Sequence, residues 1–375
     1  MRNALTALWM VAASLLFFGL VLVYTASTAQ RGGAAPVLFK QLIAAAAGLV
    51  MGAFCVTVDY RFWRSRAVLA ALSAVAIASC LLVFKWDAVN GSRRWINIGG
   101  VSLQPSEFAR IVMLMALAAW YSAIGPRSGE FVRGVLIPGG VAAAFIAPVL
   151  ASPDLGATMV MCVGAASVML AAGVRKRWIV IGGAVAMAVV AVMLVNNENK
   201  RARVMVTFNR FMGRATESAA AYHVEQSLEA FARGGMGGRG IGRSIQKNYY
   251  LPEANSDFIY AIAAEEFGIG ATVSMVVAYM ALLVCGIYIA YHANDRFGSF
   301  LALGATVTIS FEAAFNIGMV TGCLPTKGIA LPFASAGGSS LMASMVIVGL
   351  LASIGRASVD DNARRVIRDA RIKYY

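Results

Sequence analysis

Charged residues are scarce in this chain: they make up 13% of its 375 residues, whereas a typical soluble domain has about 25%. Apolar residues make up 59%, and they fall in runs of about seventeen or more rather than in the period of an amphipathic helix. A hydrocarbon layer about 30 Å thick requires runs of this length. The composition therefore excludes an ordinary water-soluble domain and indicates a membrane protein.

Cysteine and histidine are also few, with five cysteines spread singly along the chain and two histidines in all. No disulfide framework and no metal site is predicted from this spacing. Basic residues outnumber acidic ones, 32 to 18, for a net charge of +14. They stand mostly between the apolar runs, which favours membrane orientation and contact with anionic membrane lipids over nucleic-acid binding.

The apolar runs predict an all-α polytopic membrane protein with about ten transmembrane helices in a single domain over residues 1–355. Arg2 before the first run also suits a signal peptide, but this run is longer than a signal core and lacks a clear cleavage site. We therefore interpret it as the first span. The expected spans are 5–26, 37–58, 67–84, 105–121, 134–150, 156–173, 179–195, 271–291, 300–321 and 339–355.

Residues 196–256 form a large predicted loop between the seventh and eighth spans, far longer than a usual connection. Its interspersed aromatic residues favour a folded element against the membrane. An even number of spans puts both termini on one side, and basic residues after the second and sixth spans and in the tail 356–375 place that side in the cytoplasm. The large loop is then extracytoplasmic, although Lys85, Arg93 and Arg94 run against this orientation.

A glycine-rich stretch in this loop, GMGGRG from Gly235 to Gly240, matches the G-x-G-x-x-G dinucleotide pattern. No strand precedes it, and no βαβ unit fits between two membrane spans, so the context that the motif requires is absent. We expect backbone flexibility near a substrate instead of cofactor binding.

Two motifs stand at the start of the fourth expected span: NGSRRWINIG from Asn90 to Gly99, and QPSEFAR from Gln104 to Arg110. Pro105 and Glu107 also suit an ordinary helix start, where an acid complements the helix dipole. Arg110 lies about 60° round the helix from Glu107, inside an apolar run where a charge costs roughly 2.5–3.5 kcal/mol. A charge pair at the mouth of an internal cavity fits this pattern better.

Four further patterns combine polar residues with apolar surroundings. SPDLG begins at Ser152, and Thr308, Glu312 and Asn316 form a polar stripe on the ninth span that suits interhelical hydrogen bonds as well as substrate contact. QKNYYLPEANSDFIYA runs from Gln246 to Ala261. GCLPTKGIALPFASAGGSS runs from Gly322 to Ser340, and its prolines and glycines exclude a helix.

Taken together, these motifs resemble the peptidoglycan glycosyltransferases of the shape, elongation, division and sporulation (SEDS) family over essentially the whole chain. PTKG from Pro325 and LPEA from Leu251 resemble the division branch, FtsW, more than the elongation branch, RodA. The chain departs from the family pattern at four positions. Arg110 stands where lysine is usual, and Ala336 stands where tyrosine is usual. His223 and Glu312 each stand where glutamine is usual.

The resemblance implies polymerisation of lipid II into glycan strands at the outer face of the bacterial cytoplasmic membrane, with release of undecaprenyl diphosphate. It implies Asp257 as the general base, with a helix cap as the alternative role for this residue. Basic residues beside it would hold the diphosphate. The residues expected to bind substrate are Arg93, Arg94, Glu107, Arg110, Asp154, Lys247, Glu265, Lys327, Ser339 and Ser340.

Two other classes of function fit a polytopic protein, namely a lipid II flippase or transporter and a scaffold for the division machinery. The chain shows no internal repeat of the kind that transporters carry. The family resemblance implies no organic cofactor, leaves a divalent cation open, and implies a class B penicillin-binding protein (FtsI-like) and other divisome membrane proteins as partners at the septum. The apolar faces of the eighth and ninth spans are the expected partner surface, where small residues near the start of the ninth, Gly298, Ala302 and Gly304, would permit close helix approach.

Overall fold

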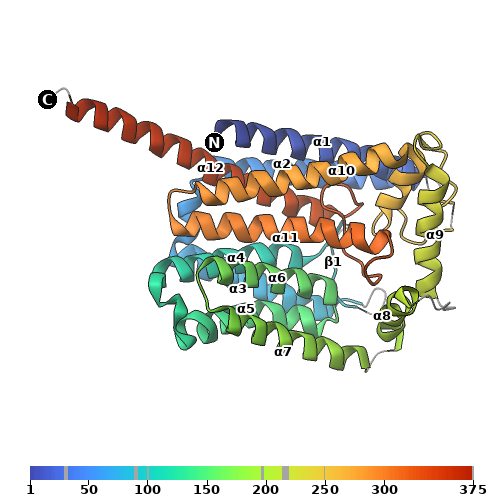
Figure 1. The fold of residues 1–375 in the computed structure, drawn as a ribbon, viewed down its shortest axis with the longest axis horizontal. Helices are drawn as coiled ribbons and strands as arrows, with labels where there is room; N and C mark the ends of the chain where they lie inside the picture. The colour runs from blue at the N-terminus through green and yellow to red at the C-terminus, as the bar shows by residue number, and fades with distance from the viewer. Residues whose placement is uncertain are drawn as a thin grey trace.

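The computed structural model describes residues 1–28, 33–87, 92–98, 101–195, 198–212, 219–248 and 250–373. It is a bundle of long helices that run roughly side by side, with the N-terminus and the end of the last helix at the same end (Figure 1). Within the described residues, eight helical segments are long and apolar enough to cross a membrane. The all-α polytopic class is confirmed, and the count of ten spans stays a prediction.

The first half of the chain, up to residue 195, contributes helices to both sides of the bundle (Figure 1). Its helices are α1 (Arg2–Ser27), α2 (Ala34–Thr57), α3 (Arg66–Leu82), α4 (Pro105–Ile124), α5 (Ile137–Ala151), α6 (Leu155–Ala171) and α7 (Lys176–Val195). Short turns connect them: η1 (Tyr60–Arg64), η2 (Val83–Lys85), η3 (Gly125–Gly129) and η4 (Val132–Leu136). Strands β1 (Ile96–Ile98) and β2 (Val101–Leu103) pair antiparallel just before α4.

The second half adds α8 (Glu198–Phe211), α9 (Ala219–Gly234), α10 (Ile259–Tyr291), α11 (Arg296–Val320) and α12 (Gly338–Lys373). Helices α8 and α9 belong to the predicted large loop, and α9 crosses the ends of the bundle helices at the side opposite the N-terminus (Figure 1). The segment predicted as a tail continues α12 as a helix to Lys373, beyond the bundle.

The predicted start of the eighth span is wrong, because α10 begins at Ile259 rather than near residue 271. The expected span began only after the acidic pair Glu265 and Glu266, but both side chains are buried and partnered inside the fold. The helix is broken at Gly268, whose φ of 77° and ψ of −172° are not helical. An apolar run with internal charges can therefore be helical where other segments neutralise those charges.

The glycine-rich stretch lies against this break. The amides of Arg239 and Gly240 donate to the carbonyls of Glu265 and Glu266 at 2.9 and 3.0 Å, which replaces helical hydrogen bonds lost at Gly268. A Cβ on Gly238 would lie 2.3 Å from the Glu266 carbonyl oxygen, so only glycine permits this approach. Part of the stretch is therefore a packing element, and its expected flexibility near a substrate stays a prediction.

At the N-terminal end of the bundle, polar contacts join η1 to α11 and α12. The Tyr60 hydroxyl donates to Asp295 at 3.0 Å, and Arg61 pairs with Asp361 at 2.6 Å. Burial raises the pKa of Tyr60, so its hydroxyl stays protonated as a donor.

The three small residues named for the expected partner surface on α11 pack inside the chain, whereas the surface itself stays a prediction. Gly298 lies against the Tyr60 ring, Ala302 is fully buried, and Gly304 packs against Leu114 and Val168. These small residues allow close packing within the chain itself.

Helices α2 and α12 pack closely against each other, through glycines on both sides. A Cβ on Gly349 would lie 2.4 Å from the carbonyl oxygen of Gly52. We expect Gly349→Ala to push these helices apart and lower the stability of the detergent-solubilised protein by about 1–3 kcal/mol, read as a fall in Tm. Gly182→Ala on α7 is the control, since nothing lies within 4 Å of its Cβ position. Equal Tm values for the two variants would contradict the packing described.

Candidate active site

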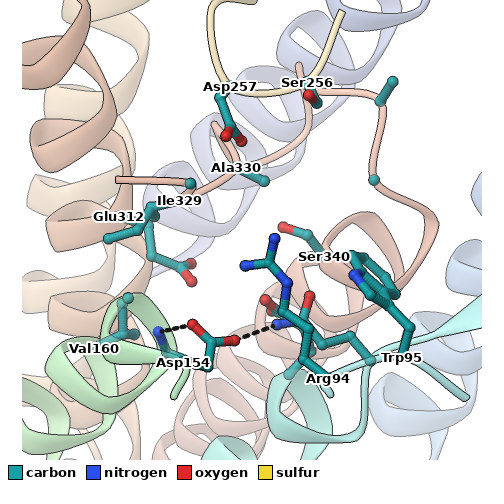
Figure 2. Close-up of a pocket in the computed structure, with 17 residues that line it drawn as sticks. Arg94, Trp95, Asp154, Val160, Ser256, Asp257, Glu312, Ile329, Ala330 and Ser340 are labelled. Carbon is teal, nitrogen blue, oxygen red and sulfur yellow. Dashed lines mark hydrogen bonds between the residues drawn. The ribbon is translucent and has the colours of Figure 1, made fainter. Parts of the chain in front are cut away.

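A cavity of about 90 Å³ lies where several helices begin, at the end of the bundle opposite the N-terminus. Figure 2 shows Arg94, Asp154, Asp257 and Glu312 pointing toward it from four separate segments. Its lining residues are Arg94, Trp95, Gln104, Glu107, Asp154, Gly156, Ala157, Val160, Ser256, Asp257, Glu312, Gly328, Ile329, Ala330, Ala336, Gly337 and Ser340.

One buried arginine joins two of the cavity carboxylates. Arg110 on α4 pairs with Glu107 one turn earlier at 3.0 Å, and its other terminal nitrogen donates to Glu312 on α11. All three side chains are buried or nearly so: Arg110 is 3% exposed, Glu107 is 11% exposed and Glu312 is 4% exposed. Two acids that would be costly to bury alone thus share a single cation.

Asp154 is held at the start of α6. Its carboxylate accepts hydrogen bonds from the Ala157 amide at 3.2 Å and from the Gln104 side chain at 3.1 Å, drawn as dashed lines in Figure 2. It caps the helix, satisfying an amide that has no partner within the helix. The Gln104 contact also ties α6 to the residue that precedes α4.

Asp257 stands just before α10, whose N-cap residue is Phe258. Its amide donates to the Glu253 carbonyl at 3.1 Å, and its own carbonyl accepts from the Asn316 side chain at 2.9 Å. The predicted alternative role as the N-cap is therefore not the arrangement found. Its carboxylate faces the backbone of Gly328, where an added Cβ would lie 2.8 Å from Oδ2.

The segment between α11 and α12 is fixed against Asp257 by backbone and side-chain contacts. Ser335 donates to the Ser256 carbonyl at 2.6 Å, and the Ala336 amide donates to the Asn255 carbonyl at 2.9 Å. Asn316 also donates to the Ile329 carbonyl at 2.7 Å. Irregular backbone at this depth is thus hydrogen-bonded and lines a polar space rather than lipid.

Helices α4, α6, α10 and α12 all begin at the cavity. Glu107 lies in the first turn of α4, Asp154 caps α6, Asp257 precedes α10, and Gly337 and Ser340 stand at the start of α12. Helix N-termini carry partial positive charge, which stabilises carboxylates and would also stabilise an anionic ligand.

Of the residues predicted from the sequence, Arg94, Glu107, Asp154, Asp257 and Ser340 line the cavity. Arg110 and Ser339 support it: Arg110 bridges the two acids, and the Ser339 hydroxyl accepts from the Gln104 amide at 2.9 Å.

Four other predicted residues do not line the cavity. Arg93 donates to the Phe84 carbonyl at 3.1 Å, and the Lys327 side chain lies near Gly156 at the start of α6. Lys247 and Glu265 are buried in a separate cluster with Glu266 and Ser244. Their expected contact with substrate stays a prediction, because sequence order alone does not reveal which way these side chains point.

Sequence reasoning missed the residues that hold the site together, chiefly Gln104 and Ser335. Both bond to segments remote in the sequence, which no local pattern indicates. Asn316 belongs to the polar stripe of the ninth expected span. Its polar amide in a mostly apolar helix indicates a contact with other protein segments rather than with lipid. Thr308 of that stripe only bonds the carbonyl of Ala305 in its own helix.

Comparisons with known proteins agree with this architecture. The family model FtsW/RodA/SpoVE, described as "Cell cycle protein", matches residues 5–359. The probable peptidoglycan glycosyltransferase FtsW of Trichlorobacter lovleyi is 36% identical over 352 residues, which cover 92% of each chain. The stage V sporulation protein E of Bacillus subtilis is 35% identical over 351 residues, covering 92% of this chain and 94% of that one.

Solved structures share the fold. A chain from a structure of "a peptidoglycan synthase complex" that coordinates polymerization and crosslinking superposes with a TM-score of 0.76 at 23% identity, covering 94% of this chain and 97% of that one. The rod shape determining protein RodA of Thermus thermophilus gives a TM-score of 0.69 at 21% identity, covering 93% and 95%.

The approach of Asp257 to Gly328 provides a test of the site geometry. We expect Gly328→Ala to displace the Asp257 carboxylate and reduce activity at least about tenfold, because misplacement of a reacting group by about 1 Å can cost 10²-fold. Gly270→Ala on α10 is the control, since its Cβ position is open. The measurement is the rate of glycan polymer formation by each purified variant. Equal rates would show that the Asp257 carboxylate does not need this close contact.

Proposed function

The chain belongs to the FtsW/RodA/SpoVE family of cell cycle proteins, and we propose that it is a peptidoglycan glycosyltransferase that polymerises lipid II during cell division. The single observation that carries the proposal is the cavity, where the Asp257 carboxylate faces a cation and the beginnings of several helices. A lipid-linked sugar diphosphate needs both: a base for its hydroxyl and positive charge for its leaving group.

The reaction joins the 4-hydroxyl of one lipid-linked disaccharide to the anomeric carbon of the growing chain. Asp257 takes the hydroxyl proton as the new C–O bond forms, and the bond from the anomeric carbon to the diphosphate breaks. Asp257 suits this role because it lines the cavity and its backbone is held on both sides by Glu253 and Asn316.

The departing undecaprenyl diphosphate carries negative charge that must be stabilised. Arg94 is the cation that lines the cavity, and the N-termini of α6 and α12 border the same space. Arg110 is a weaker candidate for this contact, because its guanidinium is already shared by Glu107 and Glu312. We assign Arg110 to the support of these two acids.

The partner is proposed from the comparisons. The similar solved chain comes from a complex described as coordinating polymerization and crosslinking, which supports a class B penicillin-binding protein as the crosslinking partner of this chain. Division rather than elongation is supported by the names of its relatives. Other divisome partners, location at the septum and cytoplasmic termini are parts of the same proposal, as is an outer-face position for the cavity.

We expect Asp257→Asn to keep expression, membrane insertion and Tm, while polymerisation of lipid II falls at least about a hundredfold. General-base catalysis is typically worth about 10²–10⁴-fold, and asparagine cannot accept the proton although it preserves the shape of the side chain. The measurement is glycan polymer formed by purified protein reconstituted with lipid II. Asp360→Asn, at an exposed position of α12, is the matched control.

Polymerisation by the Asp257→Asn variant within a few-fold of the wild-type rate would remove Asp257 from catalysis. A parallel assay of transbilayer movement of lipid II separates the polymerase from a flippase. Movement without polymer formation by the wild-type chain would contradict the proposed function as a whole.

A further inference from the structure

A second cluster of buried charges lies outside the cavity, around Lys247, Glu265 and Glu266. Lys247 is 8% exposed and the two acids are 0% and 1% exposed, and none of the three lines the cavity. Burying an ammonium and two carboxylates is costly unless each is paired and hydrogen-bonded. The chain maintains this cluster away from the proposed chemistry, so its role needs a separate account.

The ammonium of Lys247 joins three parts of the chain. It donates to the Thr25 carbonyl near the end of α1 at 3.1 Å, to the Gly242 carbonyl at 2.7 Å and to Glu266 on α10 at 2.9 Å. Its three N–H groups therefore have three acceptors, one on each segment. A group in this state has no donor left for a substrate diphosphate.

The neighbouring Glu265 holds the same stretch of the loop through different donors. Its carboxylate accepts from the Ser244 hydroxyl, from the Ile245 amide at 3.0 Å and from the Gln246 amide at 3.2 Å. We refer to Ser244, Lys247, Glu265 and Glu266 as the loop clamp. It fastens the last part of the outer loop to the first turns of α10.

Asp257 lies in the sequence between the two sides of this clamp, after Lys247 and before Glu265. The intervening chain is folded by internal bonds, with the Leu251 amide donating to the Gln246 carbonyl at 2.9 Å and the Asp257 amide donating to the Glu253 carbonyl at 3.1 Å. Both ends of the segment that carries Asp257 are thus anchored at one place.

The break in α10 makes this anchor necessary. Because Gly268 interrupts the helix, the first part of α10 does not continue the backbone ladder of the long part that follows. Its orientation is set by contacts with other segments, among them the glycine-rich stretch and the loop clamp as well as the contacts from Asn316 and Ser335 described above. The position of Asp257 at the start of this first part depends on the same contacts.

Resting on the proposed function, we infer that Lys247 and Glu266 are positioning residues that set the place of the Asp257 carboxylate. They act through the backbone of the loop and of α10 and do not touch the substrate. This role differs from the substrate contact that the sequence suggests for Lys247, and it assigns a function to a buried ion pair outside the cavity.

The test is the double variant Lys247→Met/Glu266→Gln, which removes both charges and so leaves neither one buried alone. We expect kcat for lipid II polymerisation to fall at least about tenfold with KM within about twofold of wild type, since a displaced base slows the chemical step without weakening binding. Amide hydrogen exchange at residues 256–258 should accelerate at least about tenfold, because the segment loses its anchor.

Ser244→Ala is a milder second variant that removes one donor to Glu265 and changes no charge, so it decides the question if the double variant does not fold. It should lower kcat with KM unchanged. The control is Glu229→Gln/Arg233→Met, which removes an exposed ion pair of 2.8 Å on α9 in the same loop and should leave kcat and exchange unchanged.

Wild-type kcat in both clamp variants would overturn the inference, and so would a fall in kcat without faster exchange at residues 256–258. A wild-type chain that forms no polymer would contradict the proposed function instead. The exchange measurement would still show whether the clamp positions the segment that carries Asp257.

Discussion

The structure depends on one electrostatic constraint: a charge within the apolar bundle must be paired with a group of opposite charge. Arg110 meets it by bridging Glu107 on its own helix and Glu312 on α11, which ties α4 to α11 beside the cavity. The chain uses glutamate at position 312, which places two acids around one cation. The remaining acids of the cavity are stabilised differently, since Asp154 caps α6 and Asp257 stands at the start of α10.

A related constraint on buried polar backbone groups explains why the chain around the cavity is irregular. Helices that begin at the cavity expose unsatisfied amides there, and the segments between them supply hydrogen bonds that lipid does not. Ser335, Asn316 and Gln104 make these bonds to backbone and side-chain atoms of other segments. The result is a polar space bounded by fixed backbone, with Arg94 as a cation on its wall and Asp257 on the opposite side (Figure 2).

The apolar runs were sufficient to predict most helices, because the thickness of the membrane acts locally on every span. The motifs were sufficient to predict Arg94, Glu107, Asp154, Asp257 and Ser340, which line the cavity. The location of Lys247 could not be predicted, since it depends on a pair with Glu266 on another segment. The direction of a lysine side chain is decided by acceptors far away in the sequence, such as the Thr25 carbonyl.

The central claim is that this cavity holds the reacting ends of two lipid-linked saccharides. The most direct measurement is a structure of the Asp257→Asn protein with a lipid II analogue bound. The account predicts the diphosphate within hydrogen-bond distance of Arg94 and of amides at the start of α6 or α12, with the acceptor hydroxyl beside residue 257. A diphosphate bound away from these groups, with no sugar hydroxyl within reach of residue 257, would contradict it.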